Sequence, residues 1–250
     1  MNNDFDVFIT FTESEEFYPD LLLNNDLYPS TSQLTLLELC CYHGAVDCFK
    51  LLRTKFENEI TETCLQFSFL GGNPEIMSEC LKFHKPDEQC MKYAIISHNI
   101  DFVTFLINEH MLRIGLYDCV LYHNLESFLV YFDQTNDINQ CFFYSVMFNI
   151  PSLSEYFLSE GANINQKDKY GRTALHITAS NNYKETAELL ISHGININEN
   201  DNDGKTAFCY AALKNSKETA GLLISYGGNI NEKNITEETA LRIAAEKKIR

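Results

Sequence analysis

Basic residues are scarce in this sequence, and none precedes Lys50. The 250-residue chain carries 19 Lys and Arg against 35 Asp and Glu, which gives a formal net charge of -16. Because phosphate groups are bound mainly by clustered Lys and Arg, this charge argues against nucleic acid and anionic membrane surfaces as ligands. A protein partner with a basic patch is the expected counterpart.

Long apolar runs and paired-cysteine motifs are also missing. No stretch approaches the ~20 apolar residues that a membrane span needs, and no secretory hydrophobic segment follows Met1. The nine cysteines are an odd number, include no CxxC pair and lie mostly inside apolar helical patterns. We therefore expect buried, reduced thiols in a cytoplasmic protein that does not enter the membrane.

Motifs that would carry catalysis or hold a cofactor are absent as well. The sequence has no G-x-S-x-G, no phosphate-binding loop and no H-E-x-x-H. Cys40, Cys41, His43 and Cys48 fall close together, but their spacing fits no zinc pattern. We expect no catalytic residues, no cofactor and no metal site, and therefore a protein that is not an enzyme.

The sequence does contain one pattern that is written twice. KETAELLIS at 184–192 recurs as KETAGLLIS at 217–225, and NINE at 196–199 recurs at 229–232. A fixed period of about 33 residues with two short helices per unit is typical of stacked repeats. Such an array forms one elongated core and not several independent ones.

Shorter helical pairs precede this pattern. Apolar residues at helical spacing predict hairpins over residues 36–52, 64–81, 90–107 and 116–132. We expect an asparagine in each tight turn, because asparagine tolerates the left-handed region and can hydrogen-bond its own backbone. These asparagines recur at a regular interval that lengthens after the fourth of them: Asn73, Asn99, Asn124, Asn149, Asn182 and Asn215.

The longer units gain a polar connector that contains a turn. DNDG at 201–204 is a turn sequence, with Asp at its start and Gly at its end. Thr206 is expected to cap the next helix, its hydroxyl accepting an early backbone N–H. The sequence thus predicts an all-α solenoid of stacked helix-turn-helix hairpins. Residues 1–139 form about 25- to 26-residue repeats, and residues 140–250 form about 33-residue repeats whose last copy is incomplete.

The longer units resemble ankyrin repeats. Asp168, Gly171, TALH at 173–176 and Gly194 fit the family's D-x-x-G-x-T-P-L-H signature and its glycine-containing ending, with Ala174 in place of the usual Pro. The resemblance implies β-hairpin-like fingers in this part of the chain. It also implies a structural role for His176, with its ring bonded to turn backbone.

Departures from the pattern occur in the later units. The second unit has Cys209 where the family has His, and the third has Asn234 and Glu237 where Asp and Gly are expected, which should weaken the last finger. Residues 1–139 resemble the helical domain of unknown function that precedes ankyrin repeats in large families of unicellular eukaryotes. The second helix of the last unit is missing, so we expect a fragment of a longer array.

The resemblance implies a non-enzymatic scaffold that holds a protein partner on its finger tips and on the concave face of its first helices. Met147 and Phe148 suggest such a contact, because they are two large apolar side chains at a position expected to be exposed. The other candidates are matching positions that vary between units: Lys169, Tyr170, Arg172, Ser180, Asn181, His193, Asn202, Asp203, Lys205, Leu213, Lys214 and Tyr226.

Two alternative functions fit the same sequence. Residues 2–9 are expected to form the second helix of a hairpin whose first helix is absent. With the incomplete last unit, this gives half-hairpins at both ends, which would allow copies to stack end to end as a self-assembling structural element of open oligomeric state. The chain would otherwise serve as the targeting domain of a longer protein that carries an enzyme elsewhere.

Overall fold

A computed structural model describes residues 5–15, 17–19, 21–23, 33–236, 238–240, 242 and 245 of the chain. The chain divides into two compact units, residues 1–128 (unit 1) and residues 129–250 (unit 2). Helix α9 (Leu125–Thr135) contains the boundary between them.

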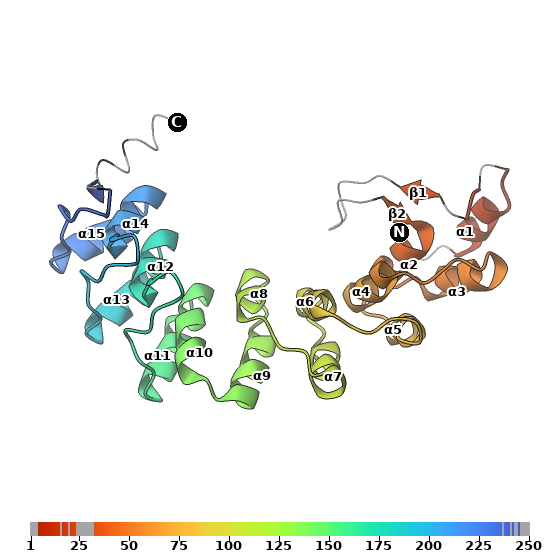
Figure 1. Ribbon diagram of the computed structural model, residues 1–250, viewed down its shortest axis with the longest axis horizontal. Coiled ribbons are helices and arrows are strands. Elements are labelled where there is room, and N and C mark those ends of the chain that lie inside the picture. Colours follow the sequence, from red (N-terminus) through yellow and green to blue (C-terminus); the bar gives the residue numbers. More distant parts are fainter. Residues whose placement is uncertain are drawn as a thin grey trace. The chain divides into compact units, whose positions relative to one another are not determined.

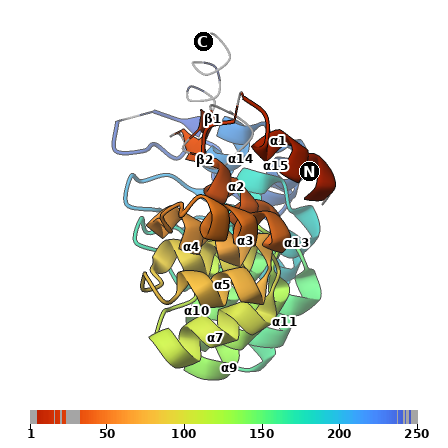
Figure 2. The ribbon, with the colours of Figure 1, turned by 90° about the vertical axis from the view of Figure 1, so that its right-hand side faces the viewer.

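Unit 1 is a row of helical hairpins that follows one helix and a short strand pair. Its elements are α1 (Phe5–Thr12), β1 (Leu22–Leu23), β2 (Leu34–Thr35), α2 (Leu36–His43), α3 (Val46–Lys55), α4 (Glu62–Gly71), α5 (Pro74–Cys80), α6 (Glu88–Ile96), α7 (Ile100–His110) and α8 (Leu116–Leu121). The first helices α2, α4 and α6 pack in a row, and the second helices α3 and α5 lie side by side (Figures 1 and 2). The sequence did not predict the antiparallel pairing of β1 with β2.

Side-chain caps begin three of the first helices of unit 1, α2, α4 and α6. Thr35 and Glu38 form a capping box, in which the Glu38 N–H donates to Thr35 Oγ1 at 3.2 Å and the Thr35 N–H donates to Glu38 Oε2 at 2.8 Å. Thr61 Oγ1 accepts from the Cys64 N–H at 3.2 Å and donates to Glu38 Oε1 at 2.7 Å. These bonds satisfy donors that a first helical turn leaves unpaired, and they link one hairpin to the next.

In unit 2, as in unit 1, the first helices of the hairpins form one layer and the second helices form another. Its elements are α10 (Ile138–Ser145), the 3-10 helix η1 (Val146–Phe148), α11 (Pro151–Ser159), α12 (Ala174–Asn181), α13 (Lys184–Ser192), α14 (Ala207–Lys214) and α15 (Lys217–Ser225). The first helices α12 and α14 pack together, and the second helices α11, α13 and α15 form a parallel row (Figure 1). Phe142, Phe157, Leu175, Leu190 and Leu223 are fully buried in the core.

The predicted all-α stack of hairpins is therefore confirmed within each unit. The predicted hairpins over residues 36–52, 64–81 and 90–107 are present, and both helices of the fourth, α8 and α9, form. The predicted boundary at residues 139 and 140 stays a prediction, and most of the last half-hairpin, from residue 241 on, lies outside the described residues.

Three of the inter-helix asparagines adopt the predicted left-handed conformation. Asn149, Asn182 and Asn215 have φ values of 54°, 59° and 60°. The side chains of the first two also reach across to the next repeat: Asn149 Oδ1 accepts from the Thr186 hydroxyl at 3.2 Å, and Asn182 Oδ1 accepts from the Thr219 N–H at 3.2 Å and its hydroxyl at 3.4 Å. Asn149 and Asn182 thus form the turns of their own repeats and also link these turns to the second helix of the next repeat.

The three earlier asparagines also lie in the tight turns as predicted, but they do not take the left-handed conformation. Asn73, Asn99 and Asn124 cap the second helices of their hairpins, with their Oδ1 atoms accepting first-turn N–H groups at 2.9–3.2 Å. Asparagine is among the preferred N-cap residues because its side-chain oxygen accepts N–H groups that a first helical turn leaves unpaired. The left-handed step falls one residue earlier in each case, at Gly72, His98 and His123.

All nine cysteines are buried and none forms a disulfide, and each lies within the described part of the chain. Burial raises the pKa of the Cys40, Cys119 and Cys141 thiols to about 12. These thiols pack as small apolar side chains in the predicted manner. Among the described residues, no cluster of three or more His, Cys, Asp or Glu side chains could hold a metal ion, and no helix is long and apolar enough to cross a membrane.

Candidate functional site

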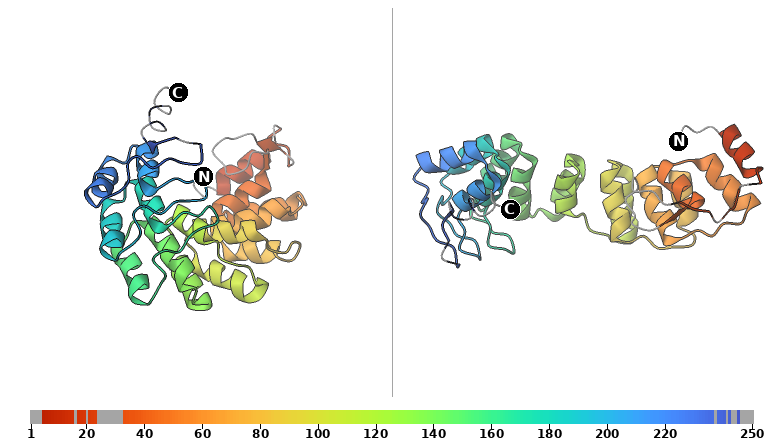
Figure 3. Two further views of the ribbon diagram at one scale, coloured as in Figure 1. Left: turned by 60° about the vertical axis from the view of Figure 1, so that its left-hand side comes forward. Right: turned by 90° about the horizontal axis from the view of Figure 1, so that it is seen from above.

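Unit 2 carries three turns that project from its helices: finger 1 (residues 167–172), finger 2 (residues 200–205) and finger 3 (residues 233–236 and 238). Figure 3 shows the loops that carry them running alongside one another, away from the helices. Each finger is closed by a backbone bond across four residues. The N–H groups of Asp168, Asp201 and Asn234 donate at 3.0 Å to carbonyl oxygens of Arg172, Lys205 and Glu238 respectively.

The side chain of the same residue completes each turn. Oδ1 of Asp168, Asp201 and Asn234 accepts the amide N–H groups two and four residues farther along, at distances of 2.8–3.0 Å. An asparagine oxygen performs this role as well as an aspartate oxygen does. Finger 3 thus forms with Asn234 in place of Asp; its expected weakening stays a prediction, and Glu237 lies outside the described residues.

Neighbouring fingers are joined by backbone hydrogen bonds. The Asn202 N–H donates to the Tyr170 carbonyl, and the Ile235 N–H donates to the Asp203 carbonyl, both at 3.0 Å. Gly171 has φ +77° at this junction, and a Cβ there would lie 2.3 Å from Asn202 Oδ1 and 2.8 Å from the Asn202 backbone N. Glycine is thus required both by the conformation and by the approach of finger 2.

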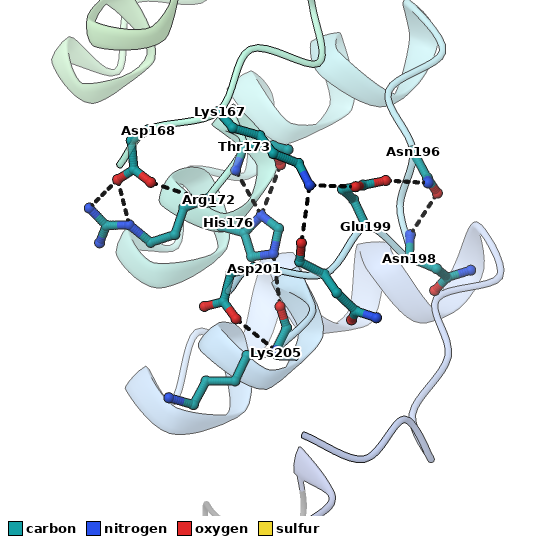
Figure 4. A network of polar contacts seen from close by, with 11 residues as sticks. Lys167, Asp168, Arg172, Thr173, His176, Asn196, Asn198, Glu199, Asp201 and Lys205 are labelled. Atoms are coloured by element: carbon teal, nitrogen blue, oxygen red, sulfur yellow. Dashed lines mark hydrogen bonds and ion pairs between the residues drawn. The ribbon is translucent and has the colours of Figure 1, made fainter. Parts of the chain in front are cut away.

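His176 connects finger 2 to the start of α12 (Figure 4). Its Nδ1 accepts the Thr173 N–H at 3.0 Å, and its Nε2 lies 3.0 Å from the Lys205 carbonyl oxygen. Because Nδ1 is an acceptor, the ring proton is on Nε2, which donates to that carbonyl. Burial lowers the pKa of His176, so the neutral form is favoured. The predicted structural role of His176 is confirmed.

Cys209 replaces this histidine in the next repeat, and the contacts change. Thr206 precedes α14 as predicted, but its side chain accepts no early N–H. Its hydroxyl instead donates to Cys209 Sγ at 3.6 Å, so the predicted hydroxyl cap is wrong. Tyr210 stacks edge-on against His176 and donates to Asp201 Oδ2 at 2.7 Å. Burial and this hydrogen bond raise the pKa of Tyr210.

Ion pairs also hold the base of the fingers. Arg172 binds Asp168 Oδ2 through Nη2 at 2.6 Å and Nε at 2.8 Å, so its guanidinium belongs to the turn. Lys167 Nζ lies 2.6 Å from Glu199 Oε1, and this hydrogen bond holds the pKa of Glu199 below its usual range. These charges therefore build the fingers and are largely compensated within the chain.

The finger tips present exposed side chains of different character. Tyr170 at the tip of finger 1 is 53% exposed, and Lys169 Nζ and the Arg172 guanidinium carbon each lie 5.0 Å from its ring centroid. Asp203 is exposed on finger 2, and Ile235 on finger 3 is 71% exposed. A shared framework thus displays an aromatic, an acidic and an apolar side chain on successive repeats.

Other predicted contact residues lie at the far ends of the first helices. Asn181 is exposed and Ser180 half-buried at the end of α12, while Lys214 is exposed and Leu213 half-buried at the end of α14. An eight-residue helix is ~12 Å long. A partner that touches both a finger and these residues would therefore extend along the helices.

The placement expected for four candidates is wrong. Phe148 is only 8% exposed and Met147 is half-buried, because η1 turns them toward the core, so neither forms an exposed apolar pair. His193 and Tyr226 are exposed, but they follow the second helices α13 and α15 and lie on neither a finger nor a first helix.

Ile235 is a candidate that the sequence reasoning missed. The 33-residue register places it in line with the candidate positions Lys169 and Asn202. Extending the same register to the third unit would have found it.

Stacked hairpins with joined finger turns define a class of repeat protein. The family profile described as ankyrin repeats (3 copies) matches residues 142–234, and the profile of a domain of unknown function (DUF3447) matches residues 56–131. No match was found among curated proteins. Residues 142–234 are therefore ankyrin repeats, and a domain of unknown function precedes them, as predicted.

Proposed function

We propose that this chain is a non-enzymatic scaffold that binds a protein partner through the finger tips and first helices of unit 2. Ankyrin repeats are protein–protein interaction modules. The use of the finger face is supported by one observation: the fingers share their framework residues but differ at their exposed tips. Framework residues such as Asp168 and Asp201 are alike, whereas Tyr170 and Asp203 are not.

Tyr170 is the proposed anchor of the contact. Its ring is half-exposed, and its position is fixed by the Asn202 N–H bond to its carbonyl and by flanking cations. Tyrosine is enriched among residues that dominate interface energies, because it buries a large area for little lost rotamer freedom. Loss of such an anchor costs about 2 kcal/mol or more, or about a 30-fold weaker affinity.

The proposed partner carries a basic patch beside an apolar group. The net charge of -16 favours association with a positively charged surface. Asp203 offers a carboxylate to such a patch. Lys205 Nζ lies 2.9 Å from Asp203 Oδ2 and neutralises part of its charge. Ile235 and Tyr170 offer the apolar contact.

Two tyrosine variants test the proposal. Proximity labelling with the full chain in its native cell would recover partners, whose affinities for purified variants are then measured. We expect Tyr170→Ala to weaken binding about 30-fold. Tyr226→Ala is the matched control, because Tyr226 is 58% exposed but follows a second helix. Equal affinities for the two variants, or a larger loss for Tyr226→Ala, would reject the finger face.

A further inference from the structure

Unit 1 contains a cavity of about 440 Å³ at the connector between α7 and α8. Its volume lies in the range of sites that hold a ligand or a few side chains of a partner. The connector has five residues, the shortest between hairpins of unit 1, and carries no finger. The cavity is lined by α6, the connector and α8: Glu88, Met91, Lys92, Met111, Leu112, Arg113, Ile114, Gly115 and Asp118.

Met111 at the edge of this cavity has an unusual conformation and exposure. It ends α7 with φ +55°, and its side chain is 82% exposed. Glycine is preferred at such a left-handed step, and Gly194 occupies the corresponding step after α13 with φ +83°. Met111 therefore leaves an apolar side chain open to water at the edge of the cavity.

The cavity lining carries two cations and two carboxylates. Glu88 and Asp118 lie in the first turns of α6 and α8, where the helix N-terminus favours a negative charge. Lys92 is half-buried and Arg113 exposed, and neither forms an ion pair within the described part of the chain. An anionic group next to an apolar one would complement this lining.

We propose that the cavity binds a peptide segment of a protein partner in which an acidic residue adjoins an apolar residue. The carboxylate pairs with Lys92 and Arg113, and the apolar side chain packs on the exposed Met111. Methionine suits this role because its flexible, polarizable side chain adapts to varied partners. Unit 1 therefore supplies a second binding site, which does not depend on the fingers of unit 2.

Phage display of random peptides against the full chain tests this site. Peptides are selected on the wild-type chain and counter-selected on a Lys92→Gln/Arg113→Gln double variant. The expected peptides carry Asp or Glu next to an apolar residue and bind the double variant about tenfold more weakly, because two partly exposed ion pairs are lost. Lys85→Gln, at an exposed lysine outside the cavity, is the control and should leave affinity unchanged.

Met111→Gly distinguishes the cavity from a general charge effect. Glycine fits the left-handed step, so the variant keeps its fold while losing the exposed side chain. The selected peptides should bind it more weakly and bind Tyr170→Ala normally. The site is rejected if no peptide depends on Lys92 and Arg113, or if dependent peptides are basic. Loss of self-association in the double variant, without peptide binding, would point to a second copy as the occupant and would also reject it.

Discussion

Replacement of Gly171 by alanine should weaken the junction between fingers 1 and 2. The left-handed conformation of Gly171 alone costs an alanine about 1–2 kcal/mol. Its Cβ would also lie 2.8 Å from the Asn202 backbone N, which forces the finger to move and weakens the bond to the Tyr170 carbonyl. Loss of that bond adds about 0.5–1.5 kcal/mol, so the variant should lose about 1.5–3.5 kcal/mol in all.

Gly194→Ala is the matched control for this prediction. Gly194 has φ +83°, but nothing lies within 4 Å of the Cβ position, so only the conformational cost of about 1–2 kcal/mol applies. Urea unfolding gives the loss in each variant, and amide hydrogen exchange at Asn202 reports the junction directly. Exchange at Asn202 should accelerate in Gly171→Ala and not in Gly194→Ala. Equal losses, with unchanged exchange at Asn202, would refute the packing argument.

Three further predictions follow from the interior of the repeats. Burial lowers the pKa of His176, so its stabilisation should be complete above pH ~6.5 and lost as the pH falls through the folded-state pKa. Acid titration of stability should show this slope, and His176→Gln, which does not titrate, should remove it. Asn182→Gly keeps the turn but loses the bonds to buried Thr219, at a cost of about 1–2 kcal/mol in urea unfolding. Asn215→Gly should be nearly neutral, because the Asn215 side chain makes no such bond in the described structure. Equal losses of stability in the two variants would contradict a stabilising role for the bonds between Asn182 and Thr219. Buried thiols such as Cys119, with its pKa raised to about 12, should react with a thiol reagent far more slowly in the native than in the unfolded protein; equal rates would contradict their burial.

Features that depend on short-range spacing were predictable from the sequence. The apolar period marks each hairpin, and the 33-residue register identifies the fingers and the role of His176. The asparagine turns were only half predictable, because one residue type can either adopt the left-handed conformation or cap a helix. The preceding residue distinguishes them: Asn99 follows His98, which takes the left-handed step itself.

Features that depend on packing between distant residues were not predictable. Phe148 was expected to be exposed, but η1 redirects the chain and buries it. The hydroxyl of Thr206 contacts the Cys209 side chain instead of capping α14. The cavity beside Met111 arises where α6 and α8 meet a short connector, which no local pattern encodes.

Site-specific photocrosslinking tests the central claim most directly, because the partner need not be identified beforehand. A benzophenone amino acid is placed at Tyr170 on finger 1, at Tyr226 after α15, or at exposed Tyr156 on α11. If the fingers hold the partner, irradiation in cells should yield a discrete crosslinked species from position 170 and none from positions 156 and 226. Crosslinks from position 156 or 226, with none from position 170, would contradict the proposed binding face.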